Sequence, residues 1–399
     1  MPTSEEYMEM ESTYGAHNYH PIPVVISKAE GVWVWDPEGR RYMDMLSSYS
    51  ALNQGHRHPR VIQAVVDQME RLTLTSRAFY NDRLGPFLKL LTEVSGMDMA
   101  LPMNTGAEAV ETGIKLARKW GYEVKGIPNN QAEIIVCQHN FHGRTTTIVG
   151  FSSDQGSREG FGPFTPGFKM IPYDDLDALK AAITPNTAAF LVEPIQGEAG
   201  VIVPSEGYMK EVRRICSQNN VLLIADEIQT GFCRTGKMFC FQHEGIKPDI
   251  VLVGKALGGG IMPVSAAIGT KEVMDVMKPG NHGSTFGGNP LACAVGTAAL
   301  EILIDEKLDK KAEEMGGYFM EQLKAMNSDK LCDIRGMGLL IAVQLKPEAG
   351  PARQYTEALK ANGLLAKETH EATIRFAPPL VITKEEVDQA MEIIRKVLG

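Results

Sequence analysis

Short runs of apolar residues alternate along the middle of the chain with stretches that have helical periodicity. Each run is unbroken and is bounded by turn residues, which is typical of strands buried on both faces of a sheet. The runs are IIVC (134–137), AAFLVE (188–193), VLLIAD (221–226), DIVLVG (249–254) and SAAIGT (265–270). The pattern predicts an α/β fold whose large domain contains a mostly parallel sheet covered by helices.

The last hundred residues have a different pattern. One long helical pattern runs from about 298 to 326, and a closing helix ends the chain. Between them lie the apolar run IRGMGLLIAVQL (334–345), a helical segment near 355–361 and the run TIRFAPPLVIT (373–383). This mixture predicts a smaller α+β domain.

Near the N-terminus, GVWVWDPEGRRYMDM (31–45) alternates apolar and polar residues about a Pro-Glu-Gly turn, which predicts a β-hairpin. A single hairpin is too small to be stable alone. We therefore expect residues 1–49 to pack with the small domain and the active site, residues 50–298 to form the large domain, and residues 299–399 to form the small domain.

The composition excludes several kinds of partner. The 399 residues include 40 basic and 49 acidic side chains, a formal net charge of −9, so we expect no nucleic-acid or anionic-membrane binding. The six cysteines are far apart and form no Cys-x-x-Cys pair, which predicts reduced thiols. The nine histidines lack a His-Glu-x-x-His motif, so no metal site is expected.

The N-terminal residues are acidic and lack the apolar core of a signal peptide. The longest apolar stretch, 249–270, is interrupted by Lys255 and a glycine triplet, so no membrane span is expected. These features predict a cytoplasmic protein.

Candidate chemistry lies where the predicted strands end, because open α/β sheets bind ligands beyond the carboxyl ends of their strands. The run 221–226 ends in Asp226, and the run 249–254 is followed by Lys255. Lys255 alone could equally be a surface ammonium on a long stem. Together the two suit pyridoxal 5′-phosphate, whose aldehyde forms a Schiff base with a lysine and whose ring nitrogen pairs with an aspartate. Burial is expected to lower the pKa of this lysine and favour its neutral amine.

A phosphate site is predicted at the start of the helical segment 103–122. Thr105 and Glu108 have the spacing of a capping box, which places the amides of Gly106 and Ala107 at the positive end of the helix dipole.

The segment GSTFGGNP (283–290) offers the hydroxyls of Ser284 and Thr285 as further donors, although by itself it could be a plain turn. No G-x-x-x-x-G-K-[ST] motif and no complete G-x-G-x-x-G motif is present, which disfavours a nucleotide enzyme.

These residues lie in eleven segments that resemble, in the same order, those of the class III pyridoxal-phosphate aminotransferases. The segments are YGAHNYHP (14–21), YMDMLSSYSALNQGHRHP (42–59), LTSRAFYN (74–81), LPMNTGAEA (101–109), FHGRT (141–145), VEPIQGEAG (192–200), ADEIQTGFCRTG (225–236), LVGKALGGG (252–260), GSTFGGNP (283–290), RGMGLL (335–340) and NGLLAKETH with IRFAPPLVI (362–382). The resemblance implies the aspartate-aminotransferase type of fold, which is fold type I of the pyridoxal-phosphate transferases.

The resemblance also implies roles for the cofactor residues. Lys255 is expected to form the Schiff base and Asp226 to pair with the ring nitrogen. Gln229 is expected to bond the ring hydroxyl, and Phe141 to stack on the ring. Gly106, Ala107 and Ser284 are expected to bind the phosphate, and Thr285 to reach the phosphate of a neighbouring subunit, so a homodimer with shared active sites is implied.

Within this family, the N-terminal tyrosine segments resemble those of the enzymes that transfer the δ-amino group of ornithine to 2-oxoglutarate. The resemblance implies that Arg144 and Tyr19 hold the α-carboxylate and α-amine of ornithine, with Tyr49 shaping the pocket. It further implies that Glu198 masks Arg375 while ornithine is bound. Arg375 would then be released to clamp the α-carboxylate of 2-oxoglutarate. Such an enzyme would act in arginine degradation or proline synthesis.

Three alternatives remain open. The first is a preference for N-acetylornithine, favoured by His142, where some ornithine enzymes have Trp, but disfavoured by SSYSALNQGHRHP (47–59). The second is another ω-amino acid such as 4-aminobutyrate, whose enzymes typically have aliphatic residues at the positions of Tyr19 and Tyr49. The third is a noncatalytic protein of the same fold, which would be expected to lose Lys255.

Overall fold

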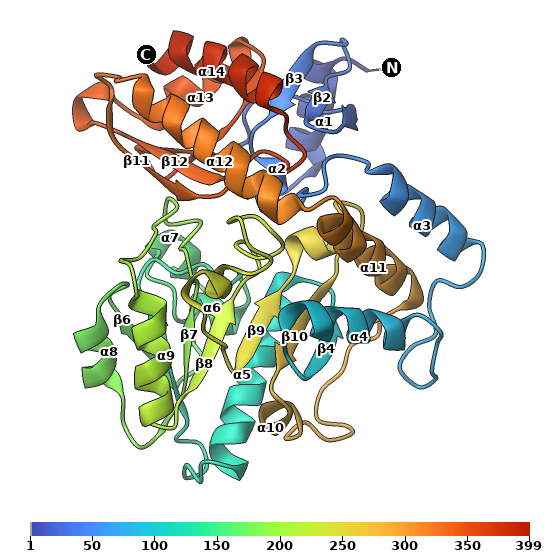
Figure 1. The fold of residues 1–399 in the computed structure, drawn as a ribbon, viewed down its shortest axis with the longest axis vertical. Helices are drawn as coiled ribbons and strands as arrows, with labels where there is room; N and C mark the ends of the chain where they lie inside the picture. Colours follow the sequence, from blue (N-terminus) through green and yellow to red (C-terminus); the bar gives the residue numbers. More distant parts are fainter. Residues whose placement is uncertain (1) are drawn as a thin grey trace.

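The computed structural model describes residues 2–399 and is built around a seven-stranded sheet with strand order β4-β10-β9-β8-β7-β5-β6 (Figure 1). The strands are β4 (Met99–Met103), β5 (Glu133–Cys137), β6 (Phe168–Ile171), β7 (Thr187–Val192), β8 (Leu222–Asp226), β9 (Ile250–Val253) and β10 (Ser265–Gly269). The strands from β9 to β6 pair in parallel, whereas β10 is antiparallel to both of its neighbours. The predicted mostly parallel sheet is confirmed.

All five strands predicted from apolar runs are present, but β4 and β6 are not predicted in this way. Both lie at the edges of the sheet and are only partly buried. Their apolar runs are interrupted, β4 by Pro102 and β6 by Lys169. A strand that is buried on one side only does not require the unbroken run that identifies a central strand.

Helices cover both faces of this sheet. α5 (Gly106–Glu123) lies on one face, where Val110 and Ile114 share an apolar cluster with strand residues. α8 (Leu176–Ala182) and α9 (Tyr208–Gln218) lie on the other face, where Val212 joins a second cluster. The result is a three-layer unit, with the carboxyl ends of β7, β8 and β9 directed toward the small sheets (Figure 1).

Two four-stranded sheets lie beyond those strand ends. One is antiparallel and contains β11 (Leu331–Met337), β12 (Leu340–Leu345), β15 (Thr373–Phe376) and β14 (Lys367–Thr369). The other contains β1 (Lys28–Glu30), β2 (Trp33–Trp35), β3 (Arg41–Asp44) and β13 (Leu364–Leu365). The β2–β3 hairpin matches the predicted one, and β13 pairs in parallel with β3. The start of the chain is thus joined to its end, although the boundaries 1–49, 50–298 and 299–399 stay a prediction.

The remaining elements are mostly helical and connect or cover these sheets. They are α1 (Ser4–Tyr14), α2 (Ser47–Ser50), α3 (Pro59–Met69), α4 (Leu84–Ser95), α6 (Thr146–Val149), α7 (Gln155–Arg158), α10 (Lys271–Met274), α11 (Pro290–Asp305), α12 (Leu308–Ala325), α13 (Ala352–Ala361) and α14 (Lys384–Leu398), with short 3₁₀ turns at Cys240–Glu244, Lys255–Gly258 and Pro347–Ala349.

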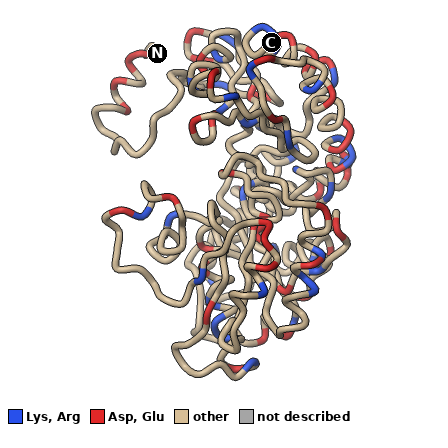
Figure 2. Tube along the Cα trace, turned by 90° about the vertical axis from the view of Figure 1, so that its left-hand side faces the viewer, with Lys and Arg blue, Asp and Glu red and all other residues tan. Residues whose placement is uncertain are grey.

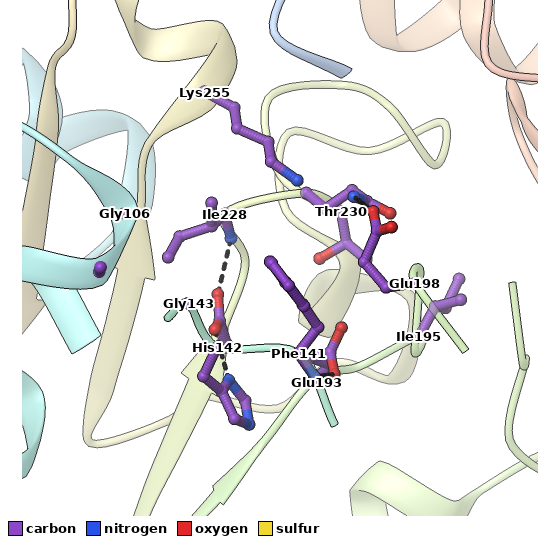
Figure 3. A pocket seen from close by; sticks show the side chains of 13 residues that line it. Gly106, Phe141, His142, Gly143, Glu193, Ile195, Glu198, Ile228, Thr230 and Lys255 are labelled. Carbon is purple, nitrogen blue, oxygen red and sulfur yellow. Dashed lines mark hydrogen bonds and ion pairs between the residues drawn. The ribbon is translucent and has the colours of Figure 1, made fainter. Parts of the chain in front are cut away.

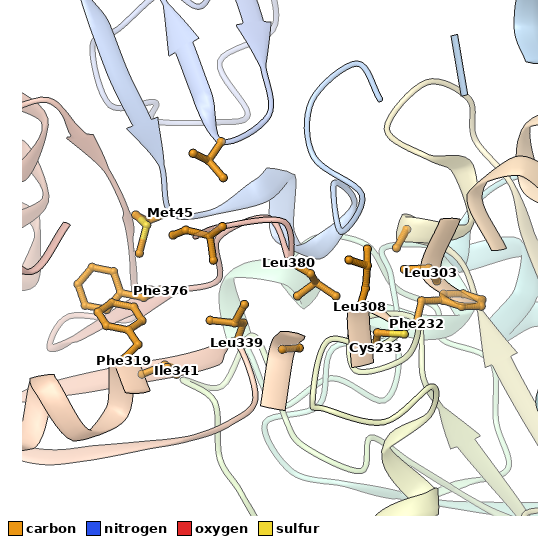
Figure 4. Packing of buried hydrophobic residues seen from close by; sticks show 14 of the residues in the cluster. Met45, Phe232, Cys233, Leu303, Leu308, Phe319, Leu339, Ile341, Phe376 and Leu380 are labelled. Carbon is orange, nitrogen blue, oxygen red and sulfur yellow. The ribbon is translucent and has the colours of Figure 1, made fainter. Parts of the chain in front are cut away.

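The prediction of one helix from 298 to 326 is wrong, because α11 and α12 are separate helices. Lys307 between them has a left-handed backbone, with φ of 52°. Residues five apart on a straight helix lie about 140° apart around its axis. Leu303 and Leu308 are both fully buried in one core, which the break permits (Figure 4). Apolar periodicity alone does not reveal this change of direction.

Charged residues of both signs are interspersed along the chain (Figure 2). Among residues 2–399, no helix combines the length and the apolarity that a membrane span requires. The described cysteines are all free thiols, five of them buried and Cys332 exposed. No group of three or more potential metal ligands gathers among the described residues.

The helix α12 packs closely on the turn of the β11–β12 hairpin. A Cβ atom on Gly316 would lie 2.0 Å from the carbonyl oxygen of Gly338. Gly338 has φ of +56° and in turn lies against the backbone of Arg234 and Thr235, in the loop that follows β8. The absence of a side chain at Gly316 therefore lets α12 approach the hairpin turn, and the absence of one at Gly338 lets that turn approach the loop that follows β8.

We predict that Gly316→Ala destabilises the protein by about 1–3 kcal/mol, because the added methyl group displaces the hairpin turn. Gly317→Ala is the matched control: no atom lies within 4 Å of its Cβ position. This control is expected to stabilise the helix by about 0.5–1 kcal/mol. Urea unfolding measures both, and equal midpoints for the two variants would contradict the packing argument.

Candidate active site

A cavity of about 200 Å³ lies at the carboxyl ends of β7, β8 and β9 (Figure 3). The sequence-predicted residues that line it are Gly106, Ala107, Phe141, Glu198, Asp226, Gln229 and Lys255. The lining also includes residues not predicted for the site, namely His142, Gly143, Glu193, Ile195, Ile228 and Thr230. The cavity therefore brings together side chains from five separate segments of the chain.

Lys255 follows β9 and projects into the cavity toward Glu198 (Figure 3). Its backbone has φ of 44°, a left-handed conformation that turns the chain sharply where the strand ends. Burial lowers the pKa of its ammonium, and the charge of Arg375 lowers it further, while Glu198 and Asp226 oppose them. A lysine with a lowered pKa is available as a neutral amine, which a nucleophile or a proton acceptor must be.

Asp226 ends β8 and is held on both carboxylate oxygens. Oδ1 accepts a hydrogen bond from the Ile228 amide at 3.1 Å, and Oδ2 lies 2.6 Å from His142 Nδ1. Burial alone would lower the pKa of His142, but the hydrogen bond and charge of Asp226, aided by Glu193, raise it overall. Asp226 is thereby oriented and paired at the cavity wall. His142 attracts attention in the sequence only as a difference from relatives, and nothing there connects it to Asp226.

Glu193 is a second buried carboxyl that the sequence analysis does not single out. It follows β7 and accepts hydrogen bonds from the amides of Phe141 at 2.9 Å and Gly197 at 3.3 Å. Burial and the charge of Asp226 together raise the pKa of Glu193 to about 7, while the charge of His142 lowers this pKa. The rule that identifies Asp226, a polar residue at the end of a buried run, would also have found Glu193. Through its hydrogen bond with the Phe141 amide, Glu193 holds the segment that carries Phe141 at the cavity.

The predicted capping box at the start of α5 is confirmed. Thr105 caps the helix, and Glu108 accepts hydrogen bonds from the amides of Asn104 and Thr105 at 2.9 and 2.7 Å. Gly106 and Ala107, at the first turn, line the cavity. The helix thus presents its positive end to any anionic group bound there.

Ser284 and Thr285 lie outside this cavity. Ser284 Oγ accepts hydrogen bonds from Asn104 Nδ2 at 2.9 Å and from the amide of Gly287 at 3.0 Å, and Thr285 is exposed. Within one chain, neither hydroxyl lines the space that Gly106 borders.

A second cavity of about 370 Å³ adjoins the first and shares Phe141, His142, Gly143 and Glu198 with it. The predicted substrate residues Tyr19, Tyr49, Arg144, Glu198 and Arg375 all line it. One guanidinium, that of Arg144, lies 5.8 Å from the centre of the Phe141 ring. The sequence positions of these residues span the whole chain, so only the fold brings them to one place.

Arg375 and Glu198 form an ion pair at the junction of the two cavities. Arg375 Nη1 donates to Glu198 Oε1 at 2.8 Å, and Arg375 is 1% exposed. Burial would raise the pKa of Glu198, but Arg375 and Lys255 lower it to about 2. Glu198 therefore remains ionised beside Arg375.

Gln229 links this ion pair to the Lys255 cavity. Its Nε2 donates to Glu198 Oε1 at 3.0 Å, while its Oε1 lies 3.4 Å from Arg375 Nη1. A Cβ atom at position 197 would lie 1.7 Å from Gln229 Oε1, so Gly197 is required for this approach. A group that bonds Gln229 would therefore lie next to the charge pair.

The donors and acceptors of the first cavity fit pyridoxal 5′-phosphate. A buried amine matches an aldehyde, a buried carboxylate matches a basic ring nitrogen, and a helix N-terminus matches a phosphate. Phe141 and Ile228 provide apolar walls for the ring. Lys255, Asp226 and the start of α5 therefore form a complete set of partners for this group.

Comparison with known proteins agrees with this geometry. The model of the family Aminotransferase class-III matches residues 14–398. The chain belongs to the class III aminotransferase family. An ornithine aminotransferase from Brevibacillus brevis is 61% identical over 398 residues, covering 100% of this chain and 99% of that protein. The Bacillus subtilis ornithine aminotransferase is 58% identical, with coverages of 99% and 98%.

Solved structures of class III aminotransferases share the fold. The ornithine aminotransferase of Toxoplasma gondii superposes with a TM-score of 0.98 at 50% identity, covering 100% of this chain and 95% of that one. The acetylornithine aminotransferase of Elizabethkingia anophelis has a TM-score of 0.91 at 51% identity, with coverages of 100% and 99%. The expected fold type is confirmed. Solved structures named as ornithine and as acetylornithine aminotransferases are both similar to this class III aminotransferase.

Glu227, behind the cavity wall, generates a pH-dependent prediction. It is fully buried, and it accepts hydrogen bonds from the Phe241 amide at 2.8 Å and from Thr230 Oγ1 at 2.5 Å. Burial raises its pKa to about 7, from an ordinary value of 4.5. Between these values the folded state keeps a proton that the unfolded state loses, so the contribution of Glu227 to stability falls as the pH rises.

Glu227→Gln removes this titration, and its amide can satisfy both neighbours. We expect the free energy of unfolding of the variant, relative to the native chain, to rise from about pH 4.5 to 7 and then stay level. Urea unfolding over pH 4.5–8.5 measures it. A constant difference across that range would show that Glu227 is already ionised in the folded protein at pH 5.

Proposed function

We propose that this protein transfers the δ-amino group of L-ornithine to 2-oxoglutarate, using pyridoxal 5′-phosphate in a ping-pong mechanism. The products are glutamate 5-semialdehyde, which cyclises to pyrroline-5-carboxylate, and glutamate. One observation carries the substrate assignment: Arg375, paired with Glu198, and Arg144, which has no carboxylate partner among residues 2–399, share with Tyr19 a cavity that adjoins the Lys255 cavity.

Pyridoxal phosphate, when bound, supplies an aldehyde for amines and a ring that withdraws electrons from the bond to be broken. Asp226, oriented by His142, would keep the ring nitrogen protonated. Gly106 and Ala107 would bind the phosphate, and Phe141 would cover the ring. Gln229 would bond the ring hydroxyl.

Lys255 is the residue that moves the proton. Its amine, with a pKa lowered by burial, takes a proton from the carbon that bears the reacting substrate amine. The same Nζ would hold that proton and return it on the far side of the reacting nitrogen. Glu198 and Asp226 lie close enough to stabilise the ammonium between these two transfers.

The charge pair provides the means to accept two substrates of different shape. Ornithine must present its δ-amine, so its α-carboxylate and α-amine extend toward Arg144 and Tyr19 while Glu198 covers Arg375. 2-Oxoglutarate must present its keto carbon, and its α-carboxylate then takes the place of Glu198 on Arg375. Its other carboxylate binds Arg144. Bidentate pairing of a guanidinium with a carboxylate gives each orientation its geometry.

N-Acetylornithine is the second candidate donor. His142 and the acetylornithine aminotransferase of E. anophelis, at 51% identity, favour it. Tyr19 favours ornithine as the donor. It lines the second cavity, is 71% exposed, and offers its hydroxyl to the free α-amine of ornithine. An acetyl group would remove that positive charge.

A homodimer with shared active sites is part of the proposal. Phe79 and Tyr80 are 73% and 103% exposed, and Phe286, beside Thr285, is 52% exposed. The segments that carry them adjoin, because Gly288 lies against Arg77 and Leu84, and a contiguous exposed apolar patch suits a protein interface. In the proposed dimer, Thr285 of one subunit would approach the first cavity of the other subunit. Sedimentation equilibrium measures the mass against the chain's 43.7 kDa.

Steady-state assays with ornithine, N-acetylornithine and 4-aminobutyrate as donors and 2-oxoglutarate as acceptor test the function. We expect ornithine to have the highest kcat/KM. Lys255→Ala is expected to remain folded and to lose activity by many orders of magnitude, because it lacks both the nucleophile and the proton carrier. A higher kcat/KM for N-acetylornithine would reject the substrate assignment. Turnover by Lys255→Ala would reject the mechanism.

The charge pair generates a separate prediction. Glu198→Ala leaves Arg375 unmasked, so the half-reaction with 2-oxoglutarate should be preserved or improved. A hydrogen bond between charged groups contributes about 1.5–3 kcal/mol, so the preference for ornithine over glutamate as donor should fall about ten- to over a hundredfold. Arg375→Ala should impair mainly the 2-oxoglutarate half-reaction. Stopped-flow absorbance measures each half, and equal effects on both halves would identify a purely structural ion pair.

A further inference from the structure

The segment that carries Tyr49 has an unusual backbone. Ser47, Ser48, Tyr49 and Ser50 have φ values of 45°, 49°, 61° and 70°. Four consecutive non-glycine residues in the left-handed region are strained, so contacts elsewhere must hold them. The short segment labelled α2 is therefore a left-handed turn, and its shape depends on its surroundings.

One buried guanidinium supplies much of that support. Arg234 is fully buried and donates from Nη2 to Ser47 Oγ at 3.1 Å and to Asn53 Oδ1 at 2.6 Å. From Nη1 it donates to the carbonyl oxygens of Leu339 at 2.9 Å and Pro378 at 2.6 Å. All four acceptors are neutral, so this cation is held by hydrogen bonds to three separate segments of the chain.

The same network reaches the segment that follows Arg375. Ser47 Oγ donates to the carbonyl oxygen of Ala377 at 2.7 Å, and the Ala377 amide donates to the Met45 carbonyl oxygen at 2.7 Å. Arg234 therefore fixes both sides of one contact. On one side is the turn that bears Tyr49, and on the other is the end of the strand that bears Arg375.

The same two segments also meet through side chains that line the second cavity. The guanidinium carbon of Arg375 lies 5.1 Å from the centre of the Tyr49 ring, within the range of a cation–π interaction. Tyr49 and Arg375 both line the second cavity, whereas Arg234 and Ser47 do not. A shift of the turn would move the ring away from Arg375 without removing any group that contacts substrate.

We propose that Arg234 and Ser47 are positioning residues that hold the left-handed turn, so that Tyr49 fixes Arg375 in the orientation that binds the α-carboxylate of the amino acceptor. The inference rests on the proposed function for the identity of that acceptor. It assigns a specificity role to two residues that do not touch the substrate.

The chain offers a matched pair of variants. Ser47→Ala removes the hydroxyl that bonds Arg234 and Ala377. Ser50→Ala removes a hydroxyl from the same turn that has no hydrogen-bond partner in the structure. Both serines are buried and both have left-handed backbones. Any effect of changing a serine in a strained turn is therefore common to both variants.

With the holoenzyme, we expect Ser47→Ala to lower kcat/KM for 2-oxoglutarate about three- to tenfold, through KM, relative to Ser50→Ala. The corresponding value for ornithine should fall less, so the ratio of kcat/KM for 2-oxoglutarate to kcat/KM for ornithine should also fall. Calorimetric titration with glutarate, an unreactive dicarboxylate, should show a similar increase in Kd. Arg234→Lys should change the ratio in the same direction. A ratio equal in the two serine variants would overturn the proposal.

A double-mutant cycle with Tyr49→Leu separates positioning from general stability. If Ser47 acts through the Tyr49 ring, adding Ser47→Ala to Tyr49→Leu should not change the ratio further. A full additional loss would overturn the proposal. If the native enzyme does not accept ornithine, the proposed function fails, while the glutarate titration still tests the role of Ser47.

Discussion

Burial of charge is the constraint on which the site depends. An ionised side chain removed from water costs several kcal/mol unless a partner replaces the lost hydration. Here Asp226 lies against His142, Glu198 against Arg375, and Arg234 against four neutral oxygens. Each partner comes from a different segment, so the charged groups are stable only when the segments are assembled correctly. The pairing that stabilises these buried charges therefore also determines where they lie in and around the cavities.

The two ends of the chain complete what the large sheet begins. The seven-stranded sheet brings Asp226 and Lys255 together, but it cannot by itself bind two carboxylates. Arg375 is contributed by β15 of the antiparallel four-stranded sheet, and Tyr49 by the turn after β3. The parallel pairing of β3 with β13, together with the hydrogen bonds of Arg234, connects these two contributors to each other and to the loop that follows β8. The lining of the second cavity therefore depends on how the two four-stranded sheets pack against the seven-stranded one.

Several features were accessible from local pattern because their causes are local. The strands β5, β7, β8 and β9 appear as unbroken apolar runs because both of their faces are buried. Thr105 and Glu108 predict the start of α5 because a capping box is a contact between residues three positions apart. Other features were not accessible in this way. The break at Lys307, the left-handed turn at Ser47–Ser50 and the pairing of His142 with Asp226 all serve contacts between residues distant in sequence, and such contacts leave no periodic trace.

The sequence by itself determined the class of chemistry, because a lysine and an aspartate after buried strands imply an amine and a carboxylate at one sheet edge. It also determined the family, through motifs whose order extends over the chain. The tertiary structure decided which groups line the two cavities and how they are paired. It set the Glu198–Arg375 pair at 2.8 Å beside Gln229, placed Glu193 behind Phe141, and positioned Tyr49 over Arg375. The reason is physical: a hydrogen bond or ion pair requires its two atoms to lie about 3 Å apart, to within a few tenths of an ångström. Tyr49 and Arg375 are more than 300 positions apart along the chain, and only the packed chain brings such residues into contact.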